Sequence, residues 1–126
     1  MEAEVYLTKA ENSLKAAQLC YENGLFDDAV SRAYYSILRA SIALLVNLGF
    51  VPETKRIHHW VQAVFPRECV RRRKIVPKEL VAYFTELHNE RDIADYQTKF
   101  LSKKSAEKSI KKSHIFISVI QKEVKK

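Results

Sequence analysis

Glycine, proline and cysteine are scarce in this chain, and their scarcity excludes several classes of fold. Only two glycines and three prolines occur among 126 residues. β-Sandwiches and barrels need many tight turns, and nucleotide folds need glycine-rich loops, so both classes are disfavoured. Long helices with few connections are favoured instead. With 47% hydrophobic residues, the chain fits one compact domain over residues 1–126.

The two cysteines, Cys20 and Cys69, have neither the spacing of a zinc site nor that of a redox motif. We therefore expect two reduced thiols. The N-terminus is acidic and carries no signal peptide, and the longest apolar run, residues 42–46, is too short to span a bilayer. We expect a soluble protein of the cytoplasm with no membrane contact.

Positive charge is concentrated in the second half of the chain, and the net charge is +7. Residues 1–50 hold 4 basic and 6 acidic side chains, whereas residues 51–126 hold 18 and 9. A strongly basic half is typical of proteins that bind RNA, DNA or an acidic protein. A solvated surface of ion pairs would explain the same charge distribution equally well. We expect the densest basic run in an exposed loop at residues 67–76; it comprises Arg71, Arg72, Arg73 and Lys74. With the lysine face of the last helix, it would attract phosphate weakly.

Apolar spacing predicts five helical segments. The first covers residues 2–22 and stops at Asn23-Gly24; the second starts near Phe26 and ends at Gly49. A shorter segment spans residues 54–65, a fourth helix has Pro77 in its first turn and ends near residue 98, and a fifth runs from about residue 102 to the C-terminus.

The second segment is unusually apolar. Between residues 29 and 48 its only charged side chains are Arg32 and Arg39, which lie two turns apart on one face. Such a helix forms either the centre of a bundle, which we take as the default, or part of an oligomer interface. A core aromatic pair is the default interpretation of its neighbouring tyrosines, Tyr34 and Tyr35, and we accept it for at least one of them.

One arginine occupies a position where helix geometry requires an apolar side chain. A single face of the fourth helix carries Leu80, Phe84, Leu87, Arg91 and Ala94. An arginine on such a face is rarely buried unless something pairs with it.

Asp95 lies one turn after Arg91 and His88 one turn before it, both within side-chain reach. The cluster is either a structural ion pair or a site whose planar guanidinium waits for a phosphate. Because an ion pair on an apolar stripe is costly if it serves only stability, we favour the second hypothesis. The adjacent Tyr96 contributes a hydroxyl or simply packs.

The histidines are weaker candidates. His88 and Asp92 have i, i+4 spacing that can hold a metal, but no third ligand is visible, so we expect no metal and no cofactor. His58 and His59 are adjacent and cannot face one ligand from a helix, and we interpret them as a polar helix start beside Trp60.

In combination these motifs resemble a known family. The chain is similar to the prokaryotic HEPN domain in four features. They are the run from Gly24 to Tyr35, the alanine- and leucine-rich helix after it, a histidine at 58 or 59 before an apolar segment ending at Phe65, and the run from Arg91 to Tyr96. The similarity is to its small stand-alone branch, with R-x-x-A-D-Y on the fourth helix. It covers nearly the whole chain.

The resemblance implies an all-α, up-and-down bundle of four or five helices that forms a homodimer. It also implies pairing with a minimal nucleotidyltransferase as toxin and antitoxin. Many HEPN members are metal-independent RNases, whose motif is an arginine, a polar residue and a histidine after four to six intervening residues. In some, a tyrosine just past that histidine is adenylylated by the partner.

This chain departs from the RNase motif at one place. Arg91 and Asp92 match its start, but positions 96 to 98 hold Tyr96, Gln97 and Thr98, so the histidine is missing. Tyr96 is the position that would correspond to the modified tyrosine, with a shorter offset from Arg91.

Three hypotheses follow. The first is a module that binds a nucleotide, an RNA phosphate or the partner enzyme, with Arg91 as anion anchor, Asp95 as its orienting carboxylate, and Asp92, His88 and Tyr96 as accessory groups. The second is a metal-independent endoribonuclease with a divergent site, whose candidate catalytic residues are Arg91, Asp95 and His88. The third is an interaction bundle without a ligand.

Overall fold

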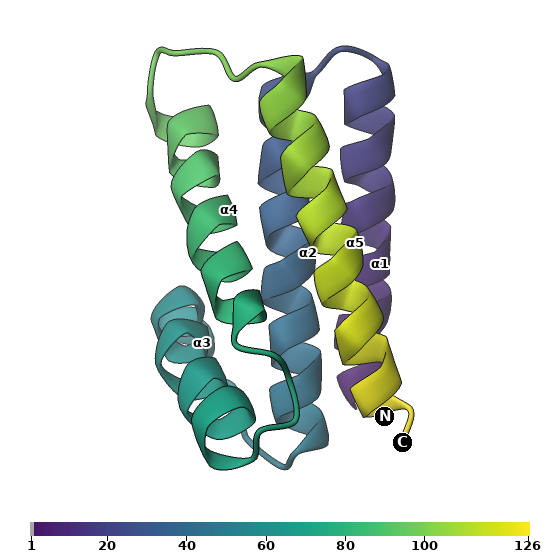
Figure 1. Ribbon diagram of the computed structural model, residues 1–126, viewed down its shortest axis with the longest axis vertical. Coiled ribbons are helices and arrows are strands. Elements are labelled where there is room, and N and C mark those ends of the chain that lie inside the picture. Colours follow the sequence, from purple (N-terminus) through teal and green to yellow (C-terminus); the bar gives the residue numbers. More distant parts are fainter. Residues whose placement is uncertain (1) are drawn as a thin grey trace.

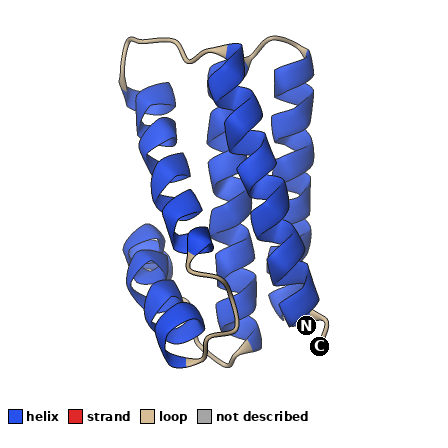
Figure 2. Ribbon diagram, in the orientation of Figure 1, coloured by secondary structure: helices blue, strands red, loops and turns tan. Residues whose placement is uncertain are grey.

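The structure, a computed structural model, describes residues 2–126, and it consists of helices joined by short connections (Figure 1). Five α-helices are present: α1 (Glu2–Glu22), α2 (Phe26–Asn47), α3 (Ile57–Phe65), α4 (Glu79–Tyr96) and α5 (Lys103–Val124). Two shorter turns, η1 (Thr54–Arg56) and η2 (Pro66–Arg72), flank α3. Within residues 2–126 there is no strand (Figure 2), and the predicted all-α class is confirmed.

Helix α2 lies at the centre of the bundle. Helices α1, α4 and α5 pack along it and α3 packs against its side. Successive long helices α1, α2, α4 and α5 alternate in direction, and both chain ends lie at the same end of the molecule (Figure 1). The topology is therefore up-and-down, as expected.

The central position of α2 explains its composition. By length and composition α2 could cross a membrane, but most of it is buried among the other helices. A core helix of a soluble bundle passes the same test, because it meets apolar neighbours on most sides.

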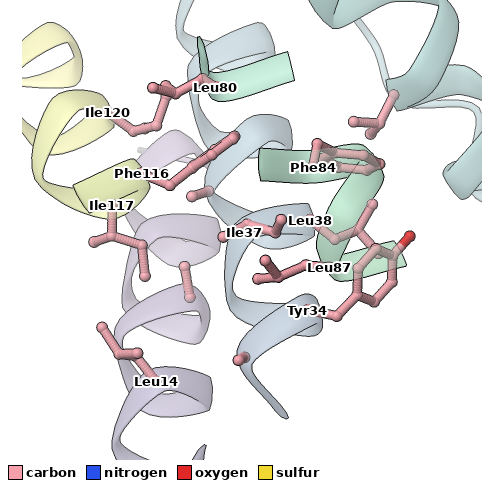
Figure 3. Close-up of a cluster of buried hydrophobic side chains, with 14 of the residues drawn as sticks. Leu14, Tyr34, Ile37, Leu38, Leu80, Phe84, Leu87, Phe116, Ile117 and Ile120 are labelled. Atoms are coloured by element: carbon pink, nitrogen blue, oxygen red, sulfur yellow. The ribbon is translucent and has the colours of Figure 1, made fainter. Parts of the chain in front are cut away.

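Side chains from four helices interlock around α2 (Figure 3). Phe65 of α3 stacks on Phe116 of α5, with ring centroids 5.6 Å apart. Other members of the buried cluster are Leu14 of α1, Ile37 and Leu38 of α2, Leu80, Phe84 and Leu87 of α4, and Ile117 and Ile120 of α5. Tyr34 lies at the edge of this cluster, beside Leu87 and Phe84 (Figure 3). The core therefore extends up to the base of the site described below.

Two glycines end the first two helices. Gly24 has φ +74° and Gly49 has φ +97°, backbone angles that residues with a Cβ atom rarely adopt. The predicted stop at Asn23-Gly24 is confirmed. Helix α2 ends at Asn47 rather than at Gly49, and Gly49 reverses the chain just beyond it.

The start and end of α4 also differ slightly from expectation. It begins at Glu79, so Pro77 lies two residues before the helix rather than inside its first turn, and it ends at Tyr96 rather than near residue 98. The connection to α5 follows directly after α4. A hydrogen bond fixes this connection to α2, since the backbone N–H of Leu101 donates to Asp27 Oδ1 at 2.8 Å.

The predicted loop at residues 67–76 is wrong for its first part. Residues 66–72 form η2, a wide π-helical turn that continues directly from α3. Pro66 has no N–H and cannot donate to the preceding turn, so the α-helical pattern is interrupted there. Cys69, expected in this loop, lies inside η2 and is buried, and burial raises the pKa of its thiol to about 12.

A buried carboxylate explains why η2 folds. Glu68 is a buried residue of this turn and accepts hydrogen bonds from Arg72 Nη1 at 2.9 Å and Arg67 Nε at 3.1 Å. Arg73 Nε is 3.7 Å from the same carboxylate. The side chains of residues 71–74 are exposed as predicted, but Glu68 compensates part of their charge.

Candidate functional site

Arg91 points into the bundle from the inner face of α4. Only 7% of the residue's surface is exposed. The predicted apolar face precedes it, since Leu80, Phe84 and Leu87 are buried, while Ala94 is half-buried. A charge in this position has lost much of its hydration and needs compensation from its neighbours.

Three tyrosine rings surround the guanidinium group. Its Cζ lies 5.0 Å from the ring centroid of Tyr34, 5.6 Å from that of Tyr96 and 6.0 Å from that of Tyr35. Cation–π attraction at these distances offsets part of the desolvation of the charge. The two tyrosines expected as a core pair are thus also the base of the site: Tyr34 is fully buried and Tyr35 half-buried.

Two carboxylates flank Arg91, but neither holds it tightly. Nη2 lies 3.4 Å from Asp92 Oδ1, and Nη1 lies 3.9 Å from Asp95 Oδ2. Arg91 Nε is buried and has no hydrogen-bond partner among residues 2–126. A buried donor without an acceptor is costly, so its presence here calls for an explanation. Arg91 therefore has unused donor capacity.

Asp95 is held in place from the neighbouring helix. The Ser31 hydroxyl of α2 donates to Asp95 Oδ1. Ser31 is buried, whereas the Asp95 side chain is partly open to solvent. The interaction fixes the carboxylate next to Arg91 and joins α2 to α4. Sequence analysis missed Ser31, whose only signal was a hydroxyl one turn before a tyrosine pair on an apolar helix.

Two histidine rings from different helices meet on Tyr34. The ring of His58, from α3, stacks on Tyr34 with centroids 5.7 Å apart and 6° between the planes. The His88 ring of α4 meets the same tyrosine edge-on at 5.5 Å. His59 is exposed. The interpretation of His58 as merely a polar helix start missed this packing, because α3 carries the residue to the cluster from a separate segment.

The protonation of the cluster follows from burial and from the charge of Arg91. Burial lowers the pKa of His58, and the nearby charges of Arg91 and His88 lower it further. Burial raises the pKa of Tyr34, an effect that Arg91 partly opposes. A neutral imidazole and a protonated phenol therefore lie side by side at neutral pH, joined by the bond between Tyr34 Oη and His58 Nδ1 at 2.7 Å.

The remaining candidates lie at the rim. His88 Nδ1 is 3.7 Å from Asp92 Oδ2. Tyr96 is 75% exposed, and Arg91 Nη1 reaches its hydroxyl only at 3.5 Å. In the part of the chain that the structure describes, no three His, Cys, Asp or Glu side chains group as metal ligands. The five predicted ligand residues thus form one cluster, with Arg91 at its base.

An apolar groove begins at the edge of this cluster. It lies between α3 and α4, has a volume of about 190 Å³, and is lined by Val61, Phe65, Phe84 and His88 among others. Since His88 belongs both to the groove and to the cluster, a ligand held at Arg91 has apolar surface within reach.

The predicted basic run does not join this site. It immediately precedes α4, whereas Arg91 is near the other end, and the 12 residues from Glu79 to Arg91 span about 18 Å of helix. Arg71 instead lines a separate groove with Val70 and Lys78.

Comparison with known proteins agrees with the helical bundle. The HEPN domain family matches residues 3–124, and the chain belongs to that family. It is 34% identical over 122 residues to "Putative toxin MJ0142" of Methanocaldococcus jannaschii, covering 96% of this chain and 80% of the relative. It is 33% identical over 125 residues to "Putative toxin MJ0605" of the same organism, covering 98% and 90%.

The chain is thus a small HEPN protein similar to two archaeal proteins that carry the name "Putative toxin". The family predicted from the sequence is confirmed. Its assignment to a branch defined by R-x-x-A-D-Y, residues 91 to 96, stays a prediction.

Proposed function

We propose that this chain is the toxin of a two-component pair and that its Arg91 cluster binds a phosphate of RNA or of a nucleotide. One observation carries the proposal: a buried guanidinium that two neighbouring carboxylates contact only at 3.4 and 3.9 Å and whose Nε has no acceptor. Phosphate oxygens match the planar fork of arginine and would accept from its terminal amino groups, which the two carboxylates do not hold tightly.

Each neighbour of Arg91 has a role in this proposal. Asp95, fixed by Ser31, orients the guanidinium, and Asp92 holds the edge of the site together with His88. The exposed ring of Tyr96, 5.6 Å from the guanidinium, would contact the bound ligand.

We further propose that the protein acts in the cytoplasm as a homodimer and pairs with a minimal nucleotidyltransferase. Support comes from HEPN membership and from the toxin-like relatives. Two large exposed side chains, Tyr96 of the cluster at 75% and Phe100 four residues later at 86%, suit a protein contact. Tyr96 is also accessible to adenylylation by such a partner. A monomeric mass in light scattering at micromolar concentration would contradict the dimer.

A specific observation favours a second candidate function, a metal-independent endoribonuclease. His58 and His88 both lie against Tyr34, beside the guanidinium, and so supply imidazoles that the motif lacks. In this mechanism neutral His58 removes the proton from a ribose 2′-hydroxyl, whose oxygen attacks the adjacent phosphorus. His88 protonates the departing 5′-oxygen, leaving a 2′,3′-cyclic phosphate, and Arg91 stabilises the charge that builds on the phosphate oxygens.

RNA binding and cleavage in EDTA test both functions. We expect Arg91→Ala to weaken binding of a labelled single-stranded RNA at least about tenfold, because it removes charge-assisted hydrogen bonds. Arg91→Lys should retain part of the affinity, since lysine keeps the charge but not the fork. Lys122→Ala, which removes an exposed charge from α5, serves as the control.

The outcomes separate the hypotheses. Unchanged RNA binding in Arg91→Ala would refute the phosphate site and favour an interaction bundle. Cleavage by the wild type that disappears in both Arg91→Ala and His58→Ala would establish the nuclease. Circular dichroism of each variant confirms that the helices remain folded.

A further inference from the structure

A polar groove between α1 and α2 collects three cations near the Arg91 cluster. It has a volume of about 310 Å³, and Lys9, Asn12 and Ser13 of α1 line it with Arg32 and Arg39 of α2. No ion pair within residues 2–126 includes Lys9, Arg32 or Arg39. Unlike the arginines around Glu68, these cations keep their charge available to a ligand.

Tyr35 connects the groove to Arg91. The centroid of its ring lies 5.6 Å from Cζ of Arg32, 5.8 Å from that of Arg39 and 6.0 Å from that of Arg91. Three guanidinium groups therefore gather around one half-buried aromatic ring. Arg32 and Arg39 are separated by about 10.5 Å along the helix axis, so they would meet different phosphates of one strand.

Arg39 is held in position before any ligand arrives. Its Nη1 donates to Ser13 Oγ at 2.6 Å, and Ser13 Oγ donates to the Lys9 carbonyl oxygen at 2.9 Å. Ser13 is 4% exposed, so this anchor is shielded from water. A guanidinium already fixed in one conformation loses less side-chain entropy when it binds.

The net charge of the Arg91 cluster indicates why a polyanion would need the cations of this groove. At the Arg91 cluster the carboxylates of Asp92 and Asp95 outnumber the single guanidinium, so the cluster alone repels a polyanion at long range. A strand that places one phosphate on Arg91 needs positive charge elsewhere along its path. Two cations without carboxylate partners, Arg32 and Arg39, lie around Tyr35, whose ring is also near Arg91.

We infer that the groove formed by Lys9, Arg32 and Arg39 binds backbone phosphates of single-stranded RNA whose neighbouring phosphate lies on Arg91. This inference rests on the proposed phosphate site at Arg91. A single strand fits better than a duplex, because Arg91 is only 7% exposed and a flexible strand can lower one phosphate to it. Cations beside an aromatic ring are typical of single-strand binding sites.

The test compares two variants that lose the same charge. Lys9→Gln with Arg32→Gln neutralises two exposed cations of the groove, and Lys104→Gln with Lys108→Gln neutralises two exposed lysines on α5. Binding of a fluorescein-labelled single-stranded RNA is measured by anisotropy between about 50 and 200 mM salt. AMP binding is measured by calorimetry as a probe of the Arg91 site alone.

We expect the groove variant to flatten the plot of log Kd against log salt by about 1.4, because each phosphate contact of a single strand contributes about 0.7. The α5 variant should change it little. AMP binding should be unaffected by the groove variant and lost in Arg91→Ala. Adding Arg39→Gln should flatten the plot further, with thermal melting used to confirm folding.

Equal effects of the groove and α5 variants on RNA would overturn the inference, and so would a groove variant that weakens AMP binding as much as RNA binding. Failure of the proposed function looks different: Arg91→Ala would then leave both AMP and RNA binding at wild-type affinity.

Discussion

The hydroxyl oxygen of Tyr34 lies 2.7 Å from Nδ1 of His58, and this bond joins α2 to α3 beside the Arg91 guanidinium. The same tyrosine ring packs against Phe84 and His88 of α4, with centroids 5.6 and 5.5 Å away. Tyr34 of α2 therefore holds the guanidinium and one imidazole of α4 and a second imidazole of α3 around one buried side chain. Its loss should affect both stability and the site.

Tyr34→Phe should lower the free energy of unfolding by about 1 kcal/mol, since it removes one hydrogen bond and leaves His58 without that partner. Tyr96→Phe removes the same atom from a residue that is 75% exposed and should change stability by less than about 0.5 kcal/mol. Urea unfolding followed by circular dichroism measures both. Equal losses would show that the Tyr34–His58 bond contributes no stability.

The pKa of His58 should rise toward its ordinary value in Arg91→Met. Methionine keeps an unbranched side chain but removes the positive charge that opposes protonation, while the desolvation of His58 remains and keeps the pKa below normal. Titration of the ring protons by NMR measures the shift. Arg56→Met, two residues before His58 on η1, is the control and should leave this pKa unchanged. A value that does not move in Arg91→Met would contradict the coupling of the two groups.

Glu68 should make the fold sensitive to acid. The hydrogen bond from Arg72, reinforced by Arg67, holds the pKa of Glu68 below its usual value although burial opposes the shift. The carboxylate therefore stabilises the folded chain above the ordinary glutamate pKa of about 4.3. That contribution is lost as the pH falls from this value through the lowered one.

Glu68→Gln should accordingly reduce the loss of stability between about pH 7 and pH 3. The free energy of unfolding at the two pH values gives the difference, and Glu53→Gln, at an exposed position, provides the comparison. If Glu68→Gln and wild type lose the same stability in acid, Glu68 is not an acid-sensitive group of this fold.

Phe116→Ala should destabilise the protein by about 3 to 5 kcal/mol, because Phe116 is fully buried and stacks on Phe65. Phe100→Ala removes the same atoms at a position that is 86% exposed and should change stability by less than about 0.5 kcal/mol. Thermal unfolding distinguishes them. If Phe116→Ala lowered Tm as little as Phe100→Ala does, the contact between α3 and α5 would contribute little to stability.

Local signals in the sequence were sufficient for the helices. Both ends of α1 agree with the prediction, because apolar periodicity marks the helix and Gly24 adopts the left-handed conformation that stops it. The inward direction of Arg91 follows from the same periodicity, since side chains four and seven residues apart share a face. Both inferences depend only on neighbours along one helix.

Contacts between separate segments could not be read in that way. His58 reaches Tyr34 because α3 packs against α2, and the hydroxyl of Ser31 faces Asp95 because α2 packs against α4. The turn at residues 66–72 forms around the buried carboxylate of Glu68, where a run of arginines suggested a loop. The pairings of His58 with Tyr34 and of Ser31 with Asp95 have no fixed spacing in sequence, since the geometry of helix packing sets them.

The sequence by itself determined the helices, their order and the arginine on the inner face of α4, because periodicity and glycine conformation are local properties. Only the tertiary structure decided which side chains surround that arginine and that the cations of α1 and α2 share one groove. Those arrangements arise when the burial of apolar surface brings distant segments together, and the polar groups at their edges must then satisfy one another.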